Sequence, residues 1–176
     1  MKTIIAFAGS NSKRSINKQL ASYTANLVSN VNVEILDLND YQLPLYSVDF
    51  EQDNGLPNVA ERFVEMIKKS DGIILSLAEH NGAYTAVFKN LFDWMSRVEQ
   101  KTFQNKPMLL MATSPGARGG ATVLEIAKGR FSYHNAQIVG EFSLPSFYEN
   151  FSEGKINNDT LNEELLVQVR QFEEAL

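Results

Sequence analysis

The sequence predicts an α/β fold, a three-layer sandwich in which helices cover both faces of a five-stranded parallel sheet. Three observations support this. Short apolar runs alternate with amphipathic segments, the apolar runs have the length of strands buried on both faces, and no repeat or low-complexity stretch interrupts the series. Right-handed crossovers between successive strands then favour the strand order 2-1-3-4-5. The length of 176 residues suits one domain, residues 1–176.

The first third of the chain predicts two strands, one helix and a long connection. Residues 4–8 form a nearly continuous apolar run that ends at a glycine, as a buried parallel strand does. Residues 16–29 carry apolar side chains at helical spacing, and residues 33–38 form the second strand. Residues 39–56 contain Pro44, precede Pro57 and show little periodicity, so we expect a loop without regular structure, which at this length is usually functional.

Helices and strands alternate regularly through the rest of the chain. Pro57 suits the first position of a helix, and the strand at residues 72–78 is the most apolar. An acidic helix closes the chain and carries one apolar stripe, with Thr160 and Glu163 at the spacing of a capping box. The expected elements are helix 57–69, strand 72–78, helix 84–98, strand 108–113, helix 120–133, strand 137–144 and the C-terminal helix.

Composition excludes several classes of function. The net charge of -5 and the absence of a Lys/Arg stripe argue against nucleic acid as a partner, because phosphate neutralisation needs a basic face. Without cysteine there is no disulfide or thiolate chemistry, and two distant histidines make a metal site improbable. No apolar run is long enough to cross a membrane and no secretory signal is apparent, so we expect a cytoplasmic protein.

Three loops follow strands at their carboxyl ends, where a doubly wound sheet binds its ligands. The first, residues 9–17, reads GSNSKRSIN and places hydroxyl and amide side chains at the start of a helix. Unpaired N–H groups at a helix start stabilise a phosphate; the alternative is that Ser15 only caps the helix and the rest of the loop is a polar turn. Because GxGxxG and P-loop patterns are absent, a mononucleotide phosphate is favoured over a pyrophosphate.

These loops resemble those of the NADPH-dependent FMN reductase family, which includes quinone, chromate and azo-dye reductases. The first loop matches the family pattern GSxRxxSxN at Gly9, Ser10, Ser15 and Asn17. Ser12 stands at the family's arginine position, so a strong phosphate partner is missing there, and Lys13 or Arg14 would have to compensate. The resemblance implies a flavodoxin-like fold, FMN as cofactor and NADPH or NADH as co-substrate.

The second and third loops carry the resemblance further. AEHNGAYTAVFKNLFDW, from residue 78, resembles the family's PEYNGSxPxxLKNxxDW, whose first part lies against the isoalloxazine ring. His80 replaces a tyrosine there and either stacks on the ring or is an exposed loop residue. In the third loop, SPGARGG, Arg118 lies near the flavin N1/O2 edge, binds a coenzyme phosphate, or is a solvated surface residue. The candidate cofactor-binding residues are Ser10, Ser12, Ser15, Ile16, Asn17, Glu79, His80, Asn81, Gly82, Ser114, Gly116 and Arg118.

The resemblance implies an oxidoreductase in which the flavin carries the chemistry and no protein side chain acts as a catalytic acid or base. Hydride would pass from NAD(P)H to the flavin N5 and then to a small-molecule electron acceptor such as free flavin, a quinone or an azo compound. The alternative is a flavodoxin-type electron carrier without its own NAD(P)H turnover. A phosphoacceptor signalling domain is excluded, because no acidic pair follows the first strand.

A homodimer or a dimer of dimers is expected from two apolar features. Phe92 widens the apolar arc of helix 84–98 beyond the stripe that should pack on the sheet, a stripe that includes Trp94. The loop at residues 39–56 adds further apolar side chains, and such patches usually mark interfaces. The alternative is that this loop folds back over Phe92 within one chain.

Overall fold

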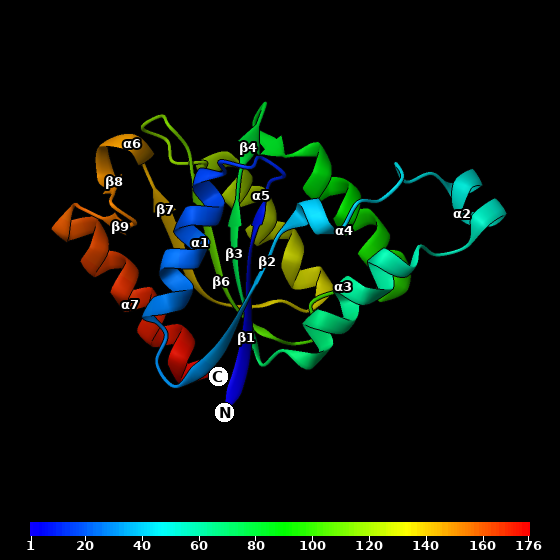
Figure 1. The fold of residues 1–176 in the computed structure, drawn as a ribbon, viewed down its shortest axis with the longest axis horizontal. Coiled ribbons are helices and arrows are strands. Elements are labelled where there is room, and N and C mark those ends of the chain that lie inside the picture. The colour runs from blue at the N-terminus through cyan, green and yellow to red at the C-terminus, as the bar shows by residue number, and fades with distance from the viewer.

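The computed structural model describes residues 1–176 and contains the predicted five-stranded parallel sheet in the predicted order, β2-β1-β3-β6-β7 (Figure 1). Each neighbouring pair of strands is parallel, as expected for right-handed crossovers through helices. The flavodoxin-like fold is thereby confirmed. The strands are β1 (Lys2–Gly9), β2 (Val31–Leu36), β3 (Gly72–Leu77), β6 (Pro107–Thr113) and β7 (Gln137–Leu144).

Helices cover both faces of the sheet and bury it in two hydrophobic clusters (Figure 1). α1 (Ile16–Leu27) and α7 (Asp159–Ala175) pack on one face. α3 (Asn58–Lys69), α4 (Ala86–Val98) and α5 (Ala121–Phe131) pack on the other. The inner strands β3 and β6 are buried almost throughout, because side chains on both of their faces meet helices. None of the helices combines the length and the apolarity needed to cross a membrane.

Two short hairpins lie outside the main sheet and were not predicted. β4 (Glu79–His80) pairs with β5 (Ala83–Tyr84), and β8 (Phe151–Ser152) pairs with β9 (Lys155–Ile156). Both turns place two successive residues at positive φ, the backbone that a two-residue type I′ turn requires. The short helix α6 (Phe147–Asn150) precedes the second hairpin.

The segment at residues 39–56 was predicted to lack regular structure, and this is wrong. A 3₁₀ turn, η1 (Leu38–Asp40), opens it, and a helix, α2 (Val48–Asn54), follows. Ser47 caps α2, since its Oγ accepts a hydrogen bond from the N–H of Phe50 at 3.1 Å. α2 projects from the body of the molecule and buries none of its residues, which is why its sequence shows no apolar periodicity (Figure 1).

Three helix starts also differ from the prediction. Pro57 is the N-cap of α3 and not its first helical residue. α4 begins at Ala86, with Thr85 as its cap, because Tyr84 belongs to the β4–β5 hairpin. The C-terminal helix is capped by Asn158, whose Oδ1 accepts the N–H of Leu161, so Thr160 is not the cap. For α4 and the C-terminal helix, the side chain that accepts the capping hydrogen bond sets the boundary, whereas Pro57 forms no such bond.

The side of α4 that faces the sheet is rotated from the one predicted. Phe92 is 6% exposed and packs on Phe103, Phe131 and the His134 ring. Trp94 is instead covered by the segment at residues 39–56, and its Nε1–H donates to the Pro44 carbonyl at 2.8 Å. Phe92 is therefore a core residue, and the argument that it needs a partner chain is wrong.

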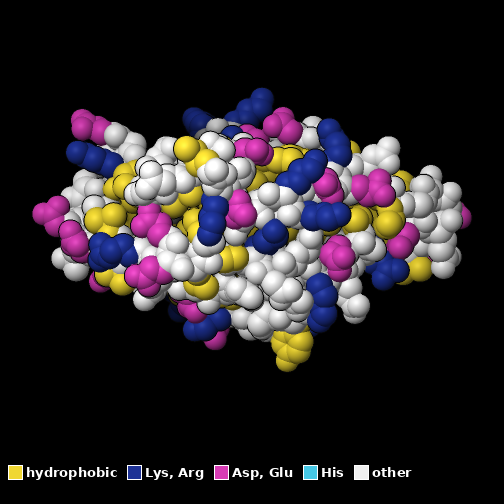
Figure 2. Space-filling model, turned by 90° about the horizontal axis from the view of Figure 1, so that it is seen from below, with side chains coloured by type: hydrophobic (Ala, Val, Ile, Leu, Met, Phe, Trp, Pro, Cys, Tyr) yellow, Lys and Arg dark blue, Asp and Glu magenta, His cyan; other side chains and the backbone are white.

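Charged side chains of both signs are interspersed over the side of the molecule opposite the carboxyl ends of the strands (Figure 2). Small hydrophobic areas lie among them, and neither sign of charge forms a continuous stripe on this view.

Candidate functional site

The three predicted loops meet at the carboxyl edge of the sheet and enclose an open cavity of about 220 Å³. It lies at the ends of β1, β3 and β6, where the direction of winding reverses. Its lining residues come from all three loops and from the start of α6. They are Ser10, Ser12, Arg14, Ser15, Ile16, Asn17, Ala78, Glu79, His80, Thr113, Ser114, Pro115 and Tyr148.

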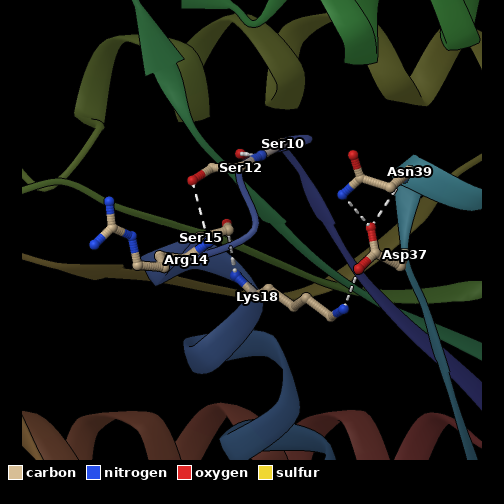
Figure 3. Close-up of polar contacts among 7 residues, drawn as sticks. All are labelled: Ser10, Ser12, Arg14, Ser15, Lys18, Asp37 and Asn39. Carbon is tan, nitrogen blue, oxygen red and sulfur yellow. Dashed lines mark hydrogen bonds and ion pairs between the residues drawn. The ribbon is translucent and has the colours of Figure 1, made fainter.

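The first loop is shaped by hydrogen bonds from its own backbone to its own hydroxyl groups (Figure 3). The N–H of Ser12 donates to Ser10 Oγ at 3.2 Å, and the N–H of Arg14 donates to Ser12 Oγ at 3.3 Å. Ser15 Oγ accepts the N–H of Lys18 at 3.1 Å and so caps α1. Because a hydroxyl accepts and donates at once, the hydrogen of Ser15 remains free to donate into the cavity.

The start of α1 adds backbone donors to these hydroxyls. The first N–H groups of a helix have no acceptor within it, which leaves those of Ile16 and Asn17 facing the cavity mouth. Their partial positive charge, together with the free hydroxyl hydrogens, stabilises an anion. No acidic side chain of the first loop opposes this, since residues 9–17 contain none.

Asn17 also ties α1 to the centre of the sheet. Its side chain is 2% exposed, and its Oδ1 accepts hydrogen bonds from Ser76 Oγ at 2.7 Å and from the N–H of Thr113 at 3.0 Å. Its Nδ2 donates to the Thr113 carbonyl at 3.1 Å. One amide hydrogen is left for a ligand, so Asn17 positions the first loop at least as much as it lines the cavity.

The cations around the first loop differ in whether a carboxylate of the chain balances their charge. Lys18 forms an ion pair with Asp37 at the end of β2, and Asp37 also accepts the N–H of Asn39 (Figure 3). The hydrogen bond from Lys18 lowers the pKa of the Asp37 carboxyl below its usual value. Lys13 and Arg14 form no ion pair, and of these two only Arg14 lines the cavity.

The second loop is the β4–β5 hairpin. Asn81 and Gly82, at φ 51° and 73°, form its turn, and the exposed side chain of His80 lies on the lining of the cavity. Glu79 Oε2 accepts the N–H of Val123 at 2.9 Å, which fixes the hairpin to the first turn of α5. The carboxylate of Glu79 is therefore occupied by a helix start and acts as a positioning group.

The third loop is held by backbone contacts with the segment that follows β7. The N–H of Ser146 donates to the Gly116 carbonyl at 2.9 Å, and that of Phe147 donates to the Ser114 carbonyl at 3.0 Å. Gly119 has φ 57°, and a Cβ there would lie 2.3 Å from Ser143 Oγ. The loop thus depends on backbone conformation more than on side-chain chemistry.

Eight of the predicted candidates line the cavity, and four do not. Asn81, Gly82, Gly116 and Arg118 belong to the bordering loops but lie outside the lining, and Arg118 Nη2 donates to Thr122 Oγ1 at 3.0 Å. The candidate set lacked Arg14, which the sequence offered only as a substitute for the family arginine, and it missed Ala78, Thr113, Pro115 and Tyr148. The segment after β7 ends at the same edge as the other loops, so the argument that selected them would also have selected Tyr148.

Comparisons with known proteins extend over nearly the whole chain. A family model described as NADPH-dependent FMN reductase matches residues 2–149, which include all three loops. A quinone reductase of Escherichia coli (strain K12) is 31% identical over 137 residues, which cover 77% of this chain and 68% of that protein. A 2-hydroxy-1,4-benzoquinone reductase of Burkholderia sp. is 31% identical over 173 residues, which cover 96% and 91%.

A solved structure is also similar over nearly the whole chain. FerB, a flavoenzyme NAD(P)H:(acceptor) oxidoreductase from Paracoccus denitrificans, superposes with a TM-score of 0.78 at 25% identity. The superposition covers 99% of this chain and 96% of FerB. The likeness therefore includes the three loops together with the sheet and helices that carry them.

Proposed function

The chain belongs to the NADPH-dependent FMN reductase family, and on this premise we propose that it transfers hydride from NAD(P)H, by way of bound FMN, to a small-molecule acceptor. It is an oxidoreductase, as its relatives named quinone reductase and FMN reductase are. When bound at the cavity, FMN would supply the redox chemistry by carrying the two electrons of the nicotinamide's hydride to the acceptor, and the residues of the three loops would hold and orient it. Quinones are the acceptor class that the relatives' names favour, with free flavin and azo compounds as further acceptors.

One observation carries this proposal: the donors of the first loop converge on the cavity, that loop contains no acidic side chain, and the one carboxylate in the lining, that of Glu79, is engaged by the N–H of Val123. Ser15 holds the start of α1 with its lone pair and keeps a hydrogen to donate, and Ile16 and Asn17 add free N–H groups. This donor set fits the phosphate of a mononucleotide. The role of these residues is to bind and orient the cofactor at the edge of the sheet.

Arg14 takes the place of the arginine that the family pattern has at position 12. Lys18 is engaged by Asp37 and Lys13 does not line the cavity, so Arg14 is the cation there without an ion pair. A charge-assisted hydrogen bond from its guanidinium would offset the missing family arginine. Ser12 then serves a different purpose, since its Oγ accepts the N–H of Arg14 and sets the direction of that residue.

The other half of the cavity suits a flat ring. The β4–β5 hairpin and the third loop form its lining, with His80 and Tyr148 as exposed aromatic side chains beside them. Glu79 is engaged by Val123, so this half offers no free carboxylate as an acid or base. The protein groups here would orient the ring and limit the access of water.

The experiment that tests the phosphate assignment is a titration of the apoprotein with FMN and with riboflavin, which lacks the phosphate. FMN should bind at least tenfold more tightly, the effect of one charge-assisted hydrogen bond or more. Arg14→Gln should reduce this ratio, whereas Lys128→Gln, an exposed lysine that does not line the cavity, should leave it unchanged. Equal affinities for the two flavins would place the phosphate elsewhere.

A second measurement separates the enzyme from a flavodoxin-type electron carrier. The FMN-loaded protein should oxidise NADPH or NADH continuously when a benzoquinone is present and slowly when it is absent. A carrier without its own coenzyme turnover would show no continuous oxidation with either coenzyme. The same assay with free FMN and an azo dye ranks the acceptors.

A homodimer remains our proposal for the assembly, and it now rests on the second of the two apolar features, the segment at residues 39–56, alone. Leu45, Val48 and Leu56 are exposed on the segment that contains α2, and the first two are 82% and 57% exposed. Such a patch marks an interface, and we infer that a second copy covers it. The double variant Leu45→Glu, Val48→Glu should sediment as a monomer, while Tyr133→Glu, on another surface, should not. A monomeric parent protein at micromolar concentration would overturn this inference.

The coenzyme also favours a cytoplasmic location for the protein, because NAD(P)H is produced and consumed there. Fractionation of the source cells with an antibody against the protein tests this. Recovery in the fraction outside the cytoplasm would contradict it.

A further inference from the structure

A second cavity, of about 440 Å³, runs along the outer face of α1 and adjoins the first cavity at Arg14 and Ser15, which line both. We call it the α1 groove. Besides Arg14 and Ser15, its lining includes Lys13, Gln19, Tyr23 and Asn26. It lies on the face of the sheet covered by α1 and α7, away from α2 and the patch proposed for the dimer (Figure 1). A second copy seated on that patch would leave the groove open.

The groove follows one stripe of α1. Ser15, Gln19, Tyr23 and Asn26 are spaced by four, four and three residues, so they lie on one side of the helix. At a rise of about 1.5 Å per residue, the stripe from Ser15 to Asn26 is about 16 Å long. A ligand in the first cavity that extends past Arg14 would therefore enter the groove and lie along α1.

The end of the groove near the first cavity is positively charged. Lys13 and Arg14 have no ion-pair partner, and no acidic side chain belongs to the lining. The charge of Lys18, also in the lining, is balanced by Asp37. On a chain with a net charge of -5, two unpaired cations beside one another favour an anionic ligand at this position.

The far end of the groove carries an aromatic ring and free amides. The Tyr23 ring packs edge-on against Phe151 with 5.8 Å between ring centroids, and its hydroxyl donates to Asn162 Oδ1 at 2.7 Å, which fixes the ring. The side chains of Gln19 and Asn26 form no hydrogen bond within the chain. A fixed aromatic ring with amide donors and acceptors beside it suits a nucleobase.

We propose that the α1 groove binds the adenosine phosphate half of the coenzyme, with phosphates beside Lys13 and Arg14 and the base toward Tyr23. This inference rests on the proposed function, since the nicotinamide end must reach the first cavity. With FMN bound, Arg14 would face the FMN phosphate, so Lys13 is the cation left for the third phosphate group of NADPH, and the groove selects NADPH over NADH. Lys13 is then a specificity residue, since it lines only the groove, whereas Arg14 lines both the groove and the first cavity.

The test is the binding of 2′,5′-ADP, an isolated fragment of NADPH, to the FMN-loaded protein by calorimetry. It should bind more tightly than 5′-AMP. Lys13→Gln should weaken it about tenfold, the effect of one charge-assisted contact, and should raise the KM for NADPH but not that for NADH. The matched control is Lys155→Gln, an exposed lysine of the neighbouring hairpin that does not line the groove.

A second variant keeps the test independent of Lys13. Gln19→Glu puts a carboxylate into the middle of the groove and should weaken 2′,5′-ADP at least tenfold. It should leave the affinity for FMN unchanged, because Gln19 does not line the first cavity. A salt titration should weaken binding to the parent protein more than binding to Lys13→Gln.

The proposal is overturned if 2′,5′-ADP does not bind the FMN-loaded protein, or if Lys13→Gln and Gln19→Glu leave its affinity unchanged. It is also overturned if Lys13→Gln raises the KM for both coenzymes equally. In each of these cases FMN binding and quinone turnover would persist, so the proposed function would stand. A protein that binds no FMN would refute the proposed function itself.

Discussion

The two halves of the proposed FMN site are built in different ways. The phosphate half, at the start of α1, depends on side chains whose hydroxyl and amide groups first hold the loop and then face the cavity. The ring half, at the β4–β5 hairpin and the third loop, depends on backbone at positive φ, as at Gly82 and Gly119. Substitutions in the phosphate half should therefore lower both the affinity for FMN and the stability of the fold. Substitutions in the ring half should chiefly lower the stability.

The largest effect is expected in the ring half. In Gly119→Ala the new Cβ would lie 2.3 Å from Ser143 Oγ and 3.0 Å from the Leu144 carbonyl, at a φ of 57° that L residues rarely adopt. The free energy of unfolding of the apoprotein in urea should fall by about 4 kcal/mol. Gly116→Ala, whose Cβ would meet nothing closer than 4.0 Å, should change it by less than about 0.5 kcal/mol. Equal losses would contradict this difference.

Asn17→Ala should be the most damaging change in the phosphate half. It leaves the Ser76 hydroxyl and the N–H of Thr113, both buried, without a hydrogen-bond acceptor. The free energy of unfolding in the same urea experiment should fall by about 3 kcal/mol. Asn26→Ala, an exposed amide on the same helix without a hydrogen bond in the chain, is the control and should cost nothing. A loss of FMN affinity in Asn17→Ala without a loss of stability would make Asn17 a ligand alone.

Variants of Ser15 can separate the two roles proposed for this residue, capping of α1 and binding of the phosphate. Ser15→Ala should lose about 1 kcal/mol of stability with the cap, and also FMN affinity. Ser15→Asp keeps a capping acceptor and should be as stable as the parent apoprotein, but its carboxylate would repel the phosphate. FMN should therefore bind Ser15→Asp at least tenfold more weakly while riboflavin binds as before. Unchanged FMN affinity in both variants would leave Ser15 as a cap only.

The smallest effect concerns Asp37, which anchors α1 to β2 through Lys18. Because Lys18 lowers the pKa of Asp37 in the folded protein, the pair stabilises the fold above the unfolded pKa of about 4. This stability is lost as the pH falls below that value and through the lower folded pKa. With side chains 36% and 29% exposed, the pair should contribute under about 1 kcal/mol at pH 7. Urea unfolding of Asp37→Asn from pH 7 to 3 should show a shallower decline than the parent.

The location of the site could be predicted from the sequence, and its phosphate half more completely than its ring half, since every first-loop candidate lines the cavity. The order of the sheet followed from alternating apolar runs, and the rule that ligands bind where the winding reverses selected the three loops. Asn81-Gly82 between two short segments is also a recognised signal for a two-residue hairpin, although the hairpin was not predicted. These features are local or follow from topology, so neighbours in sequence suffice to define them.

The sequence alone determined the class of fold, the strand order, the loops that form the cavity and the family resemblance, because each depends on residue type, spacing and chain direction. Only the tertiary structure decided that Asn17 holds Ser76 and Thr113, which lie 59 and 96 positions away. It also decided that Phe92 is core and that Lys18 is paired, which leaves Arg14 free. The physical reason is that burial and pairing depend on which distant segment packs beside a residue, and periodicity along one helix does not specify that neighbour.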